Sequence, residues 1–564
     1  MLEPLRHRLS ASRALPYLAL LGLIVGLLAG ATVILFRESI EFLQGLYLNQ
    51  DNEYRPLEPW IRFTLPLVGA LLIGLVFQLL PTAMRQVGVV HVMERLAYHQ
   101  AHLPYQNAVV QFFGAIASIA SGHSVGREGP SVHLGAANGS LLGQWLKLPN
   151  NSLTVLVACG AAGAIGASFN TPLAGVIFAM EVVLMEYSMV SFAPVILAAV
   201  SATALMRLVY GTEPAFSVPA MHMGSAWELP LVVLMALVIA VFANGFIYLM
   251  RLFSSSLTHW PIWTRMTLGG LATGLIALFV PEIMGVGHNT IDQALTGQLG
   301  LTLLIALALG KLLATTAGLG MGLPGGLIAP TMVIGAAVGG VAGIVANYLF
   351  PGDVSNHGFY AMIGMGAMMA ATLQAPLAAL MAILELTANP NILFPGMLAV
   401  IIATLTTSEL FGRQSVFLTT MRARGLDYRN DPISQSLRRL GVMTVLDKSF
   451  QILPAEVERD AVENALVQHP HWILVTEEGE PTRMLPGADL AHALSSDVEA
   501  ERFDLLSLPA RRMELTAVSS RVTMQHALRL MQENQLLALA VMEGRRVLGV
   551  VSMEKIEAYY RFSA

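Results

Sequence analysis

Cysteine and charged residues are both scarce in this chain. Cys159 is the single cysteine among 564 residues, which excludes a disulfide framework and a multi-cysteine metal site. Charged side chains make up 12% of the sequence, about half of their share in an ordinary soluble domain, and apolar ones make up 55%. A net charge of −5 argues against a nucleic-acid partner, because such a partner needs a basic face. The remaining class is an integral membrane protein, with lipid as its surroundings.

The charged residues are unevenly placed along the chain. Long apolar stretches occur up to about residue 411, and from about residue 427 the composition is that of a soluble domain. Arginines before the first apolar stretch and around residues 422–439 mark the cytoplasmic side. We see no signal-peptide cleavage site and predict a multi-pass protein of the cell inner membrane with both termini cytoplasmic. The predicted parts are an N-terminal segment 1–15, a membrane domain 16–425, a linker 426–440 and a cytoplasmic domain 441–564.

The apolar stretches fall into two classes of length. Those long enough to span a bilayer are Tyr17–Phe36, Ile61–Leu80, Ser191–Gly211, Leu229–Met250 and Phe394–Leu410. Those that we consider too short or too rich in glycine are Val109–Ser121, Leu153–Ser168, Pro172–Leu184, Tyr360–Ala371 and Pro376–Leu386. Broken helices persist in a membrane only where protein or an aqueous pathway covers them. A generic bundle of tightly packed helices is the alternative interpretation.

An internal duplication favours a transport pathway over that generic bundle. Residues 130–137 (PSVHLGAA) are echoed 200 residues later by 330–337 (PTMVIGAA). Glu181 follows Pro172 by nine residues, and Glu385 follows Pro376 by the same distance. A weaker echo relates residues 88–91 to 287–290. Such repeats, roughly 16–215 and 225–425, are typical of transporters with a site near mid-membrane, and an enzyme has no need of them.

Glycine-rich breaks precede both echoed helices, at residues 124–130 and 322–330. Helix N-termini attract anions without buried lysines, so the duplication predicts an anion pathway between two such ends. Glu128 lies in the first break and would compete with an anion for the same amides. An ionisable residue inside a membrane segment is a functional candidate. A structural ion pair with Arg127 is the alternative for Glu128.

Several motifs, in order, resemble the CLC family of chloride channels and chloride/proton antiporters. Residues 126–130 (GREGP) match its G-K/R-E-G-P motif, and residues 326–330 (GLIAP) resemble its G-x-F-x-P motif. Residues 170–181, Gly310-Lys311 and 385–387 also match. The resemblance implies chloride or another small anion as substrate, an inverted-repeat fold, and a homodimer with one pore per subunit. It also implies that Glu128 is the gating glutamate.

The anion-binding positions depart from the family pattern at three places. Val87 replaces the serine of the first filter motif, Ile328 replaces a phenylalanine, and Phe417 stands for the inner-gate tyrosine. Losing two hydroxyls should weaken or reshape the central anion site, because a hydrogen bond to a charged partner is worth about 1.5–3 kcal/mol. By resemblance, the candidate anion-binding residues are Val87, Gly88, Gly126, Arg127, Gly129, Gly326, Leu327, Ile328, Ala329 and Phe417.

Proton coupling depends on a position where this chain has valine. In many antiporters of the family a glutamate follows Glu181 directly, and here Val182 stands there. Family channels also lack that glutamate, so Val182 favours a passive channel. A chloride/proton antiporter is the alternative, with a proton route through Glu128 and Glu181, His91 or water. A regulatory membrane scaffold with an inactive pore is the third hypothesis.

Other ionisable residues have interpretations of similar weight. Lys311 either makes the electrostatic potential of the pathway more positive or forms a structural hydrogen bond with a backbone carbonyl. Glu385 either accepts hydrogen bonds from buried backbone amides or has a functional role. The spacing of His91, His123, His133 and His288 suits no metal motif, so polar packing is favoured over a metal site. We expect no cofactor.

The C-terminal region 441–564 resembles a pair of CBS repeats. Helices at Ala461–Val467 and Met524–Asn534 and strands at Ala538–Met542 and Arg546–Val551 are predicted. Some CBS pairs bind adenine nucleotides through a hydroxyl and an aspartate three residues later. Ser552 is followed by Lys555 instead, and Asp489 is preceded by Pro486. Weak or absent nucleotide binding is expected. The predicted fold is therefore an all-α, CLC-like membrane domain followed by an α/β CBS-pair domain.

Overall fold

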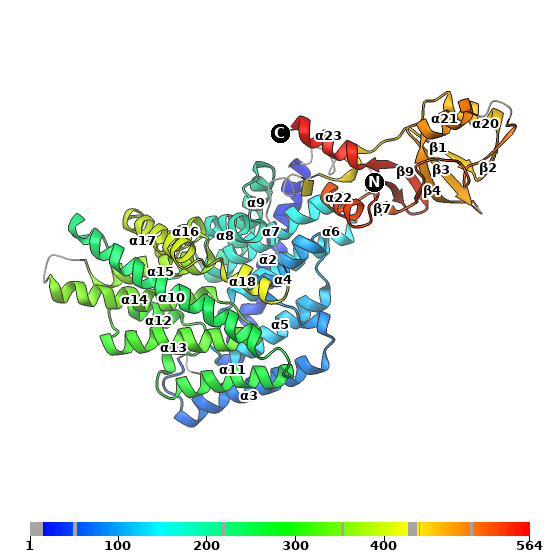
Figure 1. Ribbon diagram of the computed structural model, residues 1–564. Coiled ribbons are helices and arrows are strands. Elements are labelled where there is room, and N and C mark those ends of the chain that lie inside the picture. The colour runs from blue at the N-terminus through cyan, green and yellow to red at the C-terminus, as the bar shows by residue number, and fades with distance from the viewer. Residues whose placement is uncertain are drawn as a thin grey trace. The chain divides into compact units, whose positions relative to one another are not determined.

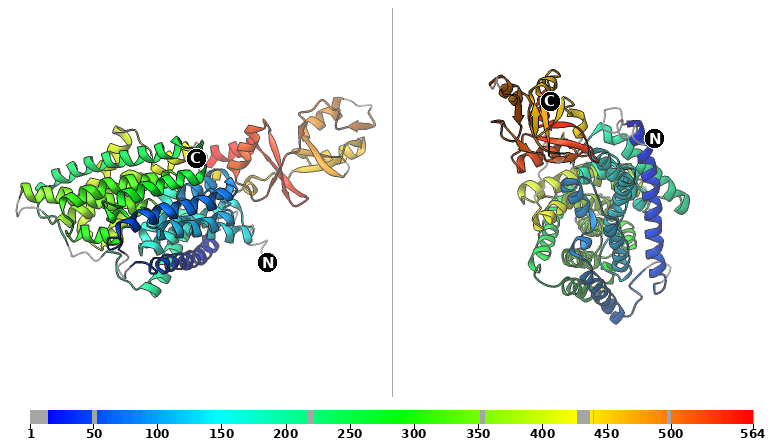
Figure 2. Two further views of the ribbon diagram at one scale, coloured as in Figure 1. Left: turned by 90° about the horizontal axis from the view of Figure 1, so that it is seen from below. Right: turned by 90° about the vertical axis from the view of Figure 1, so that its right-hand side faces the viewer.

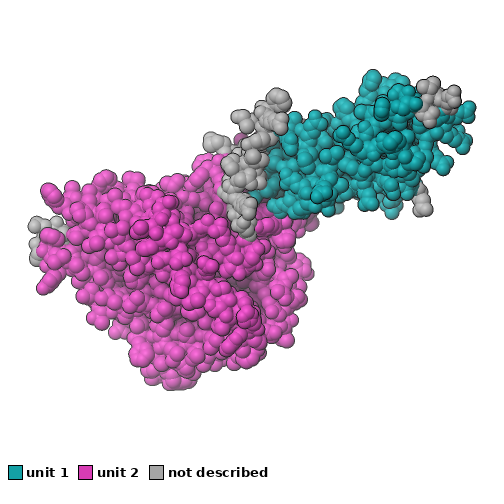
Figure 3. Space-filling view, viewed as in Figure 1, with its two compact units in different colours: residues 1–14, 147–152, 430–564 teal, residues 15–146, 153–429 magenta. Residues whose placement is uncertain are grey.

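The chain divides into two compact units, which Figure 3 colours separately. A computed structural model describes residues 15–48, 53–216, 221–350, 355–426, 437, 438, 440–477, 479–496 and 500–563. The membrane unit comprises 15–146 and 153–429, and the second unit includes the C-terminal region from residue 430 together with 147–152. The predicted N-terminal segment lies outside the described residues except for Leu15. Most of the predicted linker 426–440 lies outside them too.

The membrane unit is built from helices in both halves (Figure 1). The first half contains α2 (Leu15–Gln44), α3 (Pro59–Leu79), α4 (Gly88–Tyr98), α5 (Tyr105–Ala120), α6 (Glu128–Trp145), α7 (Asn150–Phe169), α8 (Pro172–Phe178) and α9 (Met189–Tyr210). The second half contains α10 (Leu229–Ser256), α11 (Ile262–Ala277), α12 (His288–Leu295), α13 (Leu301–Gly320), α14 (Ile328–Leu349), α15 (His357–Leu373), α16 (Pro376–Thr387), α17 (Leu393–Leu405) and α18 (Val416–Ala423).

Eight helical segments in the described part of the chain are long and apolar enough to cross a membrane. They include every stretch that the sequence predicts to span. The expectation for Leu153–Ser168 was wrong, because α7 extends it to 20 residues and makes it a candidate span. The polar residues Asn150–Ser152, which do not belong to the apolar stretch, form the first turn of this helix. Within the most apolar 18-residue stretch of α7, 94% is buried inside the protein. Protein rather than lipid therefore covers this helix, and its glycines are tolerated there.

The two halves have equivalent packing. Helix α2 packs against α9 in the first half, as α10 packs against α17 in the second. Across the halves, α3 lies along α11 and α8 meets α16 (Figure 1). Small residues allow the closest approaches: a Cβ on Gly160 would lie 1.9 Å from the carbonyl oxygen of Gly135, between α7 and α6. Helix packing in lipid depends on such close backbone contacts.

The C-terminal unit contains mixed sheets flanked by helices, and it follows the predicted pattern. Its strands are β1 (Phe450–Pro454), β2 (Glu456–Glu458), β3 (Trp472–Glu477), β4 (Glu480–Pro486), β5 (Arg502–Asp504), β6 (Met513–Glu514), β7 (Ala517–Ser519), β8 (Ala538–Glu543) and β9 (Arg546–Ser552). Its helices are α20 (Arg459–Leu466), α21 (Gly487–Ser496), α22 (Met524–Glu533) and α23 (Met553–Ser563). The predicted hairpin around Glu543-Gly544 is confirmed by β8 and β9.

One strand arrangement occurs twice in this unit, in the orange and red parts of Figure 2. Strand β1 pairs in parallel with β3, which pairs antiparallel with β4, and β7, β8 and β9 repeat this order. The segment ahead of each module joins the sheet of the other one. Strand β6 pairs with β4, and Asp447 forms a backbone bridge with Val550 on β9. The two modules are therefore interlocked, and the predicted fold class is confirmed for both units.

Candidate anion pathway

The two glycine-rich breaks meet inside the membrane unit. The Gly126 amide donates to the Gly326 carbonyl at 2.6 Å, and the Gly326 amide donates to the Gly126 carbonyl at 2.7 Å. Each half thus supplies the same bond to the other, as expected for a two-fold relation between repeats. Helices α6 and α14 begin two residues later, and no side chain caps either helix. We call this junction the crossing.

Glycine is required at the crossing because the two backbones touch. A Cβ on Gly326 would lie 2.6 Å from the amide nitrogen of Gly129 and 3.0 Å from the Gly126 carbonyl oxygen. A Cβ on Gly129 would lie 2.9 Å from the Cα of Gly326. The remaining predicted positions here, Leu327, Ile328 and Ala329, form the buried start of α14. The motif residues from both halves therefore form one buried site.

Glu128 is the first residue of α6, and its side chain is fully buried. Neither carboxylate oxygen makes a hydrogen bond of standard geometry with the described residues, although the amides of Glu128 itself and of Ala329 lie close to it. The carboxylate turns back toward the crossing, because a Cβ on Gly126 would meet its Oε2 at 2.3 Å. An ionised carboxylate that is buried without partners is costly. Proximity to an uncapped helix start offsets only part of that cost.

Two cationic side chains, those of Arg127 and Lys311, lie close enough to this carboxylate to act on it electrostatically. The Arg127 guanidinium donates through Nη2 to the Ser168 carbonyl at 3.3 Å. Lys311 is fully buried on α13, and its Nζ donates to the carbonyls of Ile283 and Gly285 at 2.9 and 2.8 Å. The proposed carbonyl tie of Lys311 is therefore present.

The first filter motif has a different local arrangement from the crossing. Helix α4 begins at Gly88, whose φ of +83° suits glycine, and Val87 gives no side-chain cap. The Gly88 amide donates to Gln111 Oε1 at 2.6 Å, so a side chain already occupies this candidate anion donor. Nothing in the motif pattern points to Gln111. Phe417 is buried in the first turn of α18, which packs against α4.

The glutamates at equivalent positions in the repeats form reciprocal caps. Glu181 accepts from the amides of Leu377 and Ala378 at the start of α16, at 3.3 and 2.8 Å. Glu385 accepts at 3.1 and 2.7 Å from the matching amides of Leu173 and Ala174 in α8. One of the two interpretations of Glu385, satisfaction of buried backbone, therefore has direct geometric support, and it extends to Glu181.

A cavity of about 220 Å³ lies beside Glu181 and Val182. Arg413, Gln414 and Ser415, which precede α18, line it as well. The position where antiporters of the family carry their second glutamate thus borders a space that is lined by both polar and apolar side chains. His91 forms a buried hydrogen bond of 2.9 Å between its Nδ1 and His133 Nε2, which joins α4 to α6. The described residues contain no group of three His, Cys, Asp or Glu side chains placed to hold a metal ion.

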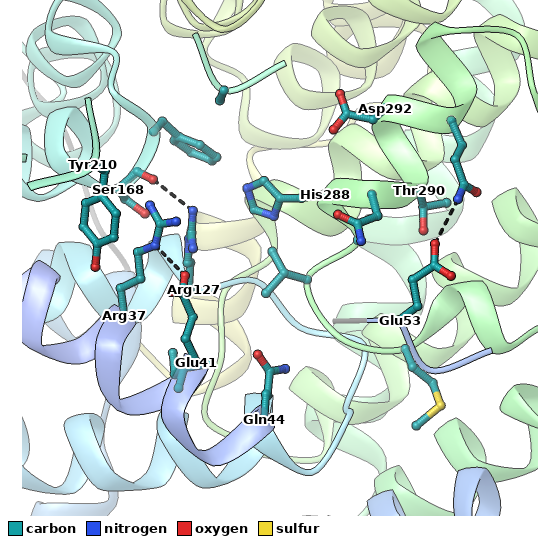
Figure 4. Close-up of a pocket in the computed structure, with 18 of the residues that line it drawn as sticks. Arg37, Glu41, Gln44, Glu53, Arg127, Ser168, Tyr210, His288, Thr290 and Asp292 are labelled. Carbon is teal, nitrogen blue, oxygen red and sulfur yellow. Dashed lines mark hydrogen bonds and ion pairs between the residues drawn. The ribbon is translucent and has the colours of Figure 1, made fainter. Parts of the chain in front are cut away.

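A larger cavity of about 510 Å³, here called the vestibule, reaches Arg127 but is not lined by Glu128. It lies at the C-terminal end of α2 and the start of α12. Figure 4 shows Arg37 and Arg127 on one side, His288 in the middle, and Glu53 and Asp292 on the other side. No sequence motif points to Arg37 or Asp292. The vestibule is assembled by tertiary packing of distant segments.

The candidate nucleotide residues of the C-terminal unit are occupied by protein contacts. Lys555 Nζ lies 2.9 Å from Asp447 Oδ2, and His471 Nδ1 lies 2.8 Å from the same oxygen. Ser552 Oγ accepts from the Lys555 amide, and Asp489 accepts from the Arg511 amide at 2.8 Å. The lysine that departs from the nucleotide-binding pattern is thus held by a buried aspartate.

Comparisons with known proteins converge on one family. Residues 68–408 match the family model described as voltage gated chloride channel. The "Putative chloride channel protein ClcB-like" of Ralstonia nicotianae is 32% identical over 422 residues, covering 73% of this chain and 97% of the relative. The H(+)/Cl(-) exchange transporter ClcA of Vibrio cholerae is 31% identical over 318 residues, covering 55% of this chain and 68% of the relative.

A solved structure gives the same result at the level of the fold. A slow cyanobacterial Cl−/H+ antiporter superposes with a TM-score of 0.65 at 23% identity. The match covers 72% of this chain and 98% of that structure. The arrangement of helices is therefore shared with a protein of known architecture.

Proposed function

Because this chain belongs to the voltage-gated chloride channel (CLC) family of anion transport proteins, we propose that it conducts chloride passively past a gate formed by Glu128. The observation that carries the proposal is the crossing: two uncapped helix starts joined by reciprocal Gly126–Gly326 bonds, with a buried and unpartnered carboxylate beside them. The side chains at three predicted filter positions, Val87, Ile328 and Phe417, are apolar and cannot donate a hydrogen bond to the ion. Backbone groups are therefore its main ligands.

The mechanism follows from competition for one electropositive place. The starts of α6 and α14 supply partial positive charge without forming a covalent or ionic trap, so an anion can bind and leave. The Glu128 carboxylate competes for this place as a tethered anion. When a proton neutralises it or an anion displaces it, the carboxyl group moves aside and the pathway opens. Buried Lys311 lowers the cost of a dehydrated anion nearby.

Passive conduction is favoured over exchange because Val182 cannot carry a proton and Glu181 is held by two backbone amides. Proton-coupled exchange is the second candidate. It is favoured by the Vibrio relative, whose name is that of an exchange transporter, and by the cavity beside Glu181 and Val182. An inactive scaffold is the third candidate.

Purified protein in liposomes distinguishes these functions. Chloride efflux is recorded with an electrode while internal pH is followed with a trapped dye. Efflux without a pH change supports the channel, and efflux with stoichiometric proton uptake supports the exchanger. Absence of chloride flux under both gradients would contradict the proposal.

We further propose a homodimer in the cell inner membrane, with one pathway per subunit and both termini in the cytoplasm. The resemblance and the distribution of arginines support this arrangement. Cross-linking in native membranes and accessibility of tags at each terminus test it. The vestibule, at the far end of α2 from residue 15, then opens to the outside.

The C-terminal unit is proposed to assemble or regulate the protein without strong nucleotide binding. Contact of Lys555 with Asp447 supports this role, because an incoming ribose would have to break an ion pair whose aspartate side chain is only 6% exposed. Titration calorimetry of the full-length protein with ATP is expected to show no binding in the micromolar range. Micromolar affinity would contradict the proposal.

A further inference from the structure

Helix α5 holds the first filter segment through two buried amide side chains that lie one helical turn apart. Asn107 Nδ2 donates to the carbonyls of Ala83 and Gln86, at 2.8 and 2.9 Å. Gln111, which is fully buried, accepts through Oε1 from the Gly88 amide at 2.6 Å. The position of the segment before α4 and the first amide of α4 therefore both depend on α5.

The same face of α5 also reaches the second glycine-rich break. Gly114 follows Gln111 by three residues, so the two residues lie on one side of the helix. A Cβ on Gly114 would lie 3.1 Å from Pro324 Cγ. Gln111 therefore belongs to a helix face that touches both motifs of the proposed pathway.

The carboxamide of Gln111 is bonded through its oxygen only. Oε1 accepts from Gly88, whereas Nε2 is buried and has no hydrogen-bond partner among the described residues. A buried donor without an acceptor costs free energy. The side chain thus removes one amide donor from the start of α4, and its own buried NH2 group offers the pathway no donor in return.

Space for an ion remains beside this amide. Gly88 is partly exposed, and a Cβ on it would meet no atom within 4 Å, apart from its chain neighbours and its own helix. The side chains at the neighbouring filter positions, Val87 and Phe417, donate no hydrogen bond. An anion in this space is therefore left with the other free amides in the first turn of α4.

A shortage of donors changes the order in which anions bind. A strongly hydrated anion such as fluoride needs many ligands in place of its water shell, whereas thiocyanate, nitrate and bromide need fewer. We propose that Gln111 sets the anion preference by withdrawing the Gly88 amide, so that weakly hydrated monovalent anions bind more tightly than chloride, and fluoride binds least. This inference rests on the proposed function, because it concerns the same pathway.

Equilibrium binding to the full-length protein in detergent tests the inference by calorimetry without transport. Gln111→Leu frees the Gly88 amide, so chloride should bind about tenfold more tightly, and fluoride should gain more than thiocyanate. Gln111→Glu holds the amide with a charged oxygen and should weaken chloride binding at least tenfold. Gln78→Leu is the matched control, because Gln78 Oε1 accepts from the Ile262 amide at the start of α11, at 3.2 Å. Its chloride affinity should change less than twofold.

Opposite shifts in the two Gln111 variants distinguish this role from damage to the fold, which would weaken binding in both. Equal or weaker chloride binding in folded Gln111→Leu would overturn the inference. The wild type gives a second test that needs no variant, because thiocyanate and bromide should bind more tightly than chloride, and tightest binding of fluoride would overturn it. The expected binding pattern in a protein without chloride flux would support the inference and contradict the proposed function.

Discussion

Replacing Gly326 by alanine perturbs the crossing without changing charge. The new Cβ would lie 2.6 Å from the amide nitrogen of Gly129 and 3.0 Å from the Gly126 carbonyl oxygen, so backbone on both sides must move apart. Overpacking of this kind costs about 1–3 kcal/mol. Weakening two reciprocal hydrogen bonds adds about 1 kcal/mol for each. Together these terms cost about 3–5 kcal/mol on the anion-binding arrangement, and the lower figure alone corresponds to roughly a hundredfold loss of occupancy.

The assay is the initial rate of chloride efflux per mole of reconstituted Gly326→Ala protein. Gly245→Ala is the matched control, because a Cβ on this α10 glycine meets nothing within 4 Å. The control should conduct like the wild type, and Gly326→Ala should lose at least nine-tenths of its flux while eluting as a folded protein. Wild-type flux in folded Gly326→Ala would refute the reasoning that the two helix starts must touch.

Three further predictions concern other contacts. Glu181→Gln and Glu385→Gln each weaken a pair of charge-assisted hydrogen bonds from backbone amides, so both should lower the thermal unfolding temperature in detergent to a similar extent. Loss of proton movement in Glu181→Gln alone would instead identify Glu181 as a proton relay. Burial alone would raise the pKa of Asp447, but its bonds with Lys555, the Ser449 amide and His471 together outweigh burial and hold this pKa below its usual value. The contribution of Asp447 to stability is therefore present above about pH 4 and is lost as pH falls further. Asp447→Asn should remove that acid-dependent step from the unfolding of the C-terminal unit, and an unchanged step would exclude this aspartate. Burial raises the pKa of Asp292 to about 6, so acidification through this value removes a negative charge from the vestibule and should increase anion flux. The measurement is made in a Glu128→Gln background, where the increase should vanish when Asp292→Asn is added. An increase that persists in the double variant would assign the titration to another group.

Local motifs determine how much of this architecture can be predicted from sequence. The breaks at 124–130 and 322–330 are recognisable because glycine and proline at a fixed spacing interrupt an apolar helix, and interrupted helices in a membrane occur only where protein or an aqueous pathway covers them. The equivalence of Pro172–Glu181 and Pro376–Glu385 is visible for the same reason. Their reciprocal capping is not visible in this way, because each glutamate caps the helix of the other repeat, 197 or 211 residues away in the sequence.

Contacts between distant segments are not predictable in this way. Gln111 binds the Gly88 amide across 23 residues of sequence, and no local pattern distinguishes this glutamine from others. The vestibule combines Arg37 of α2, Arg127 of the break before α6 and Asp292 of α12, which only the tertiary fold brings together. Lys555 could be identified as a departure from a motif, but its partner Asp447 lies in the segment that crosses to the other module. Such sites depend on packing between elements.

The most direct test of the Glu128 gate is the chloride efflux rate of Glu128→Gln relative to the wild type in the same liposomes. Removing the charge of the tethered competitor should raise the rate at least tenfold, because a neutral carboxyl group no longer closes the pathway. Glu409→Gln, at an exposed glutamate, should leave the rate unchanged. Equal rates for Glu128→Gln and the wild type would contradict a gating carboxylate at the crossing.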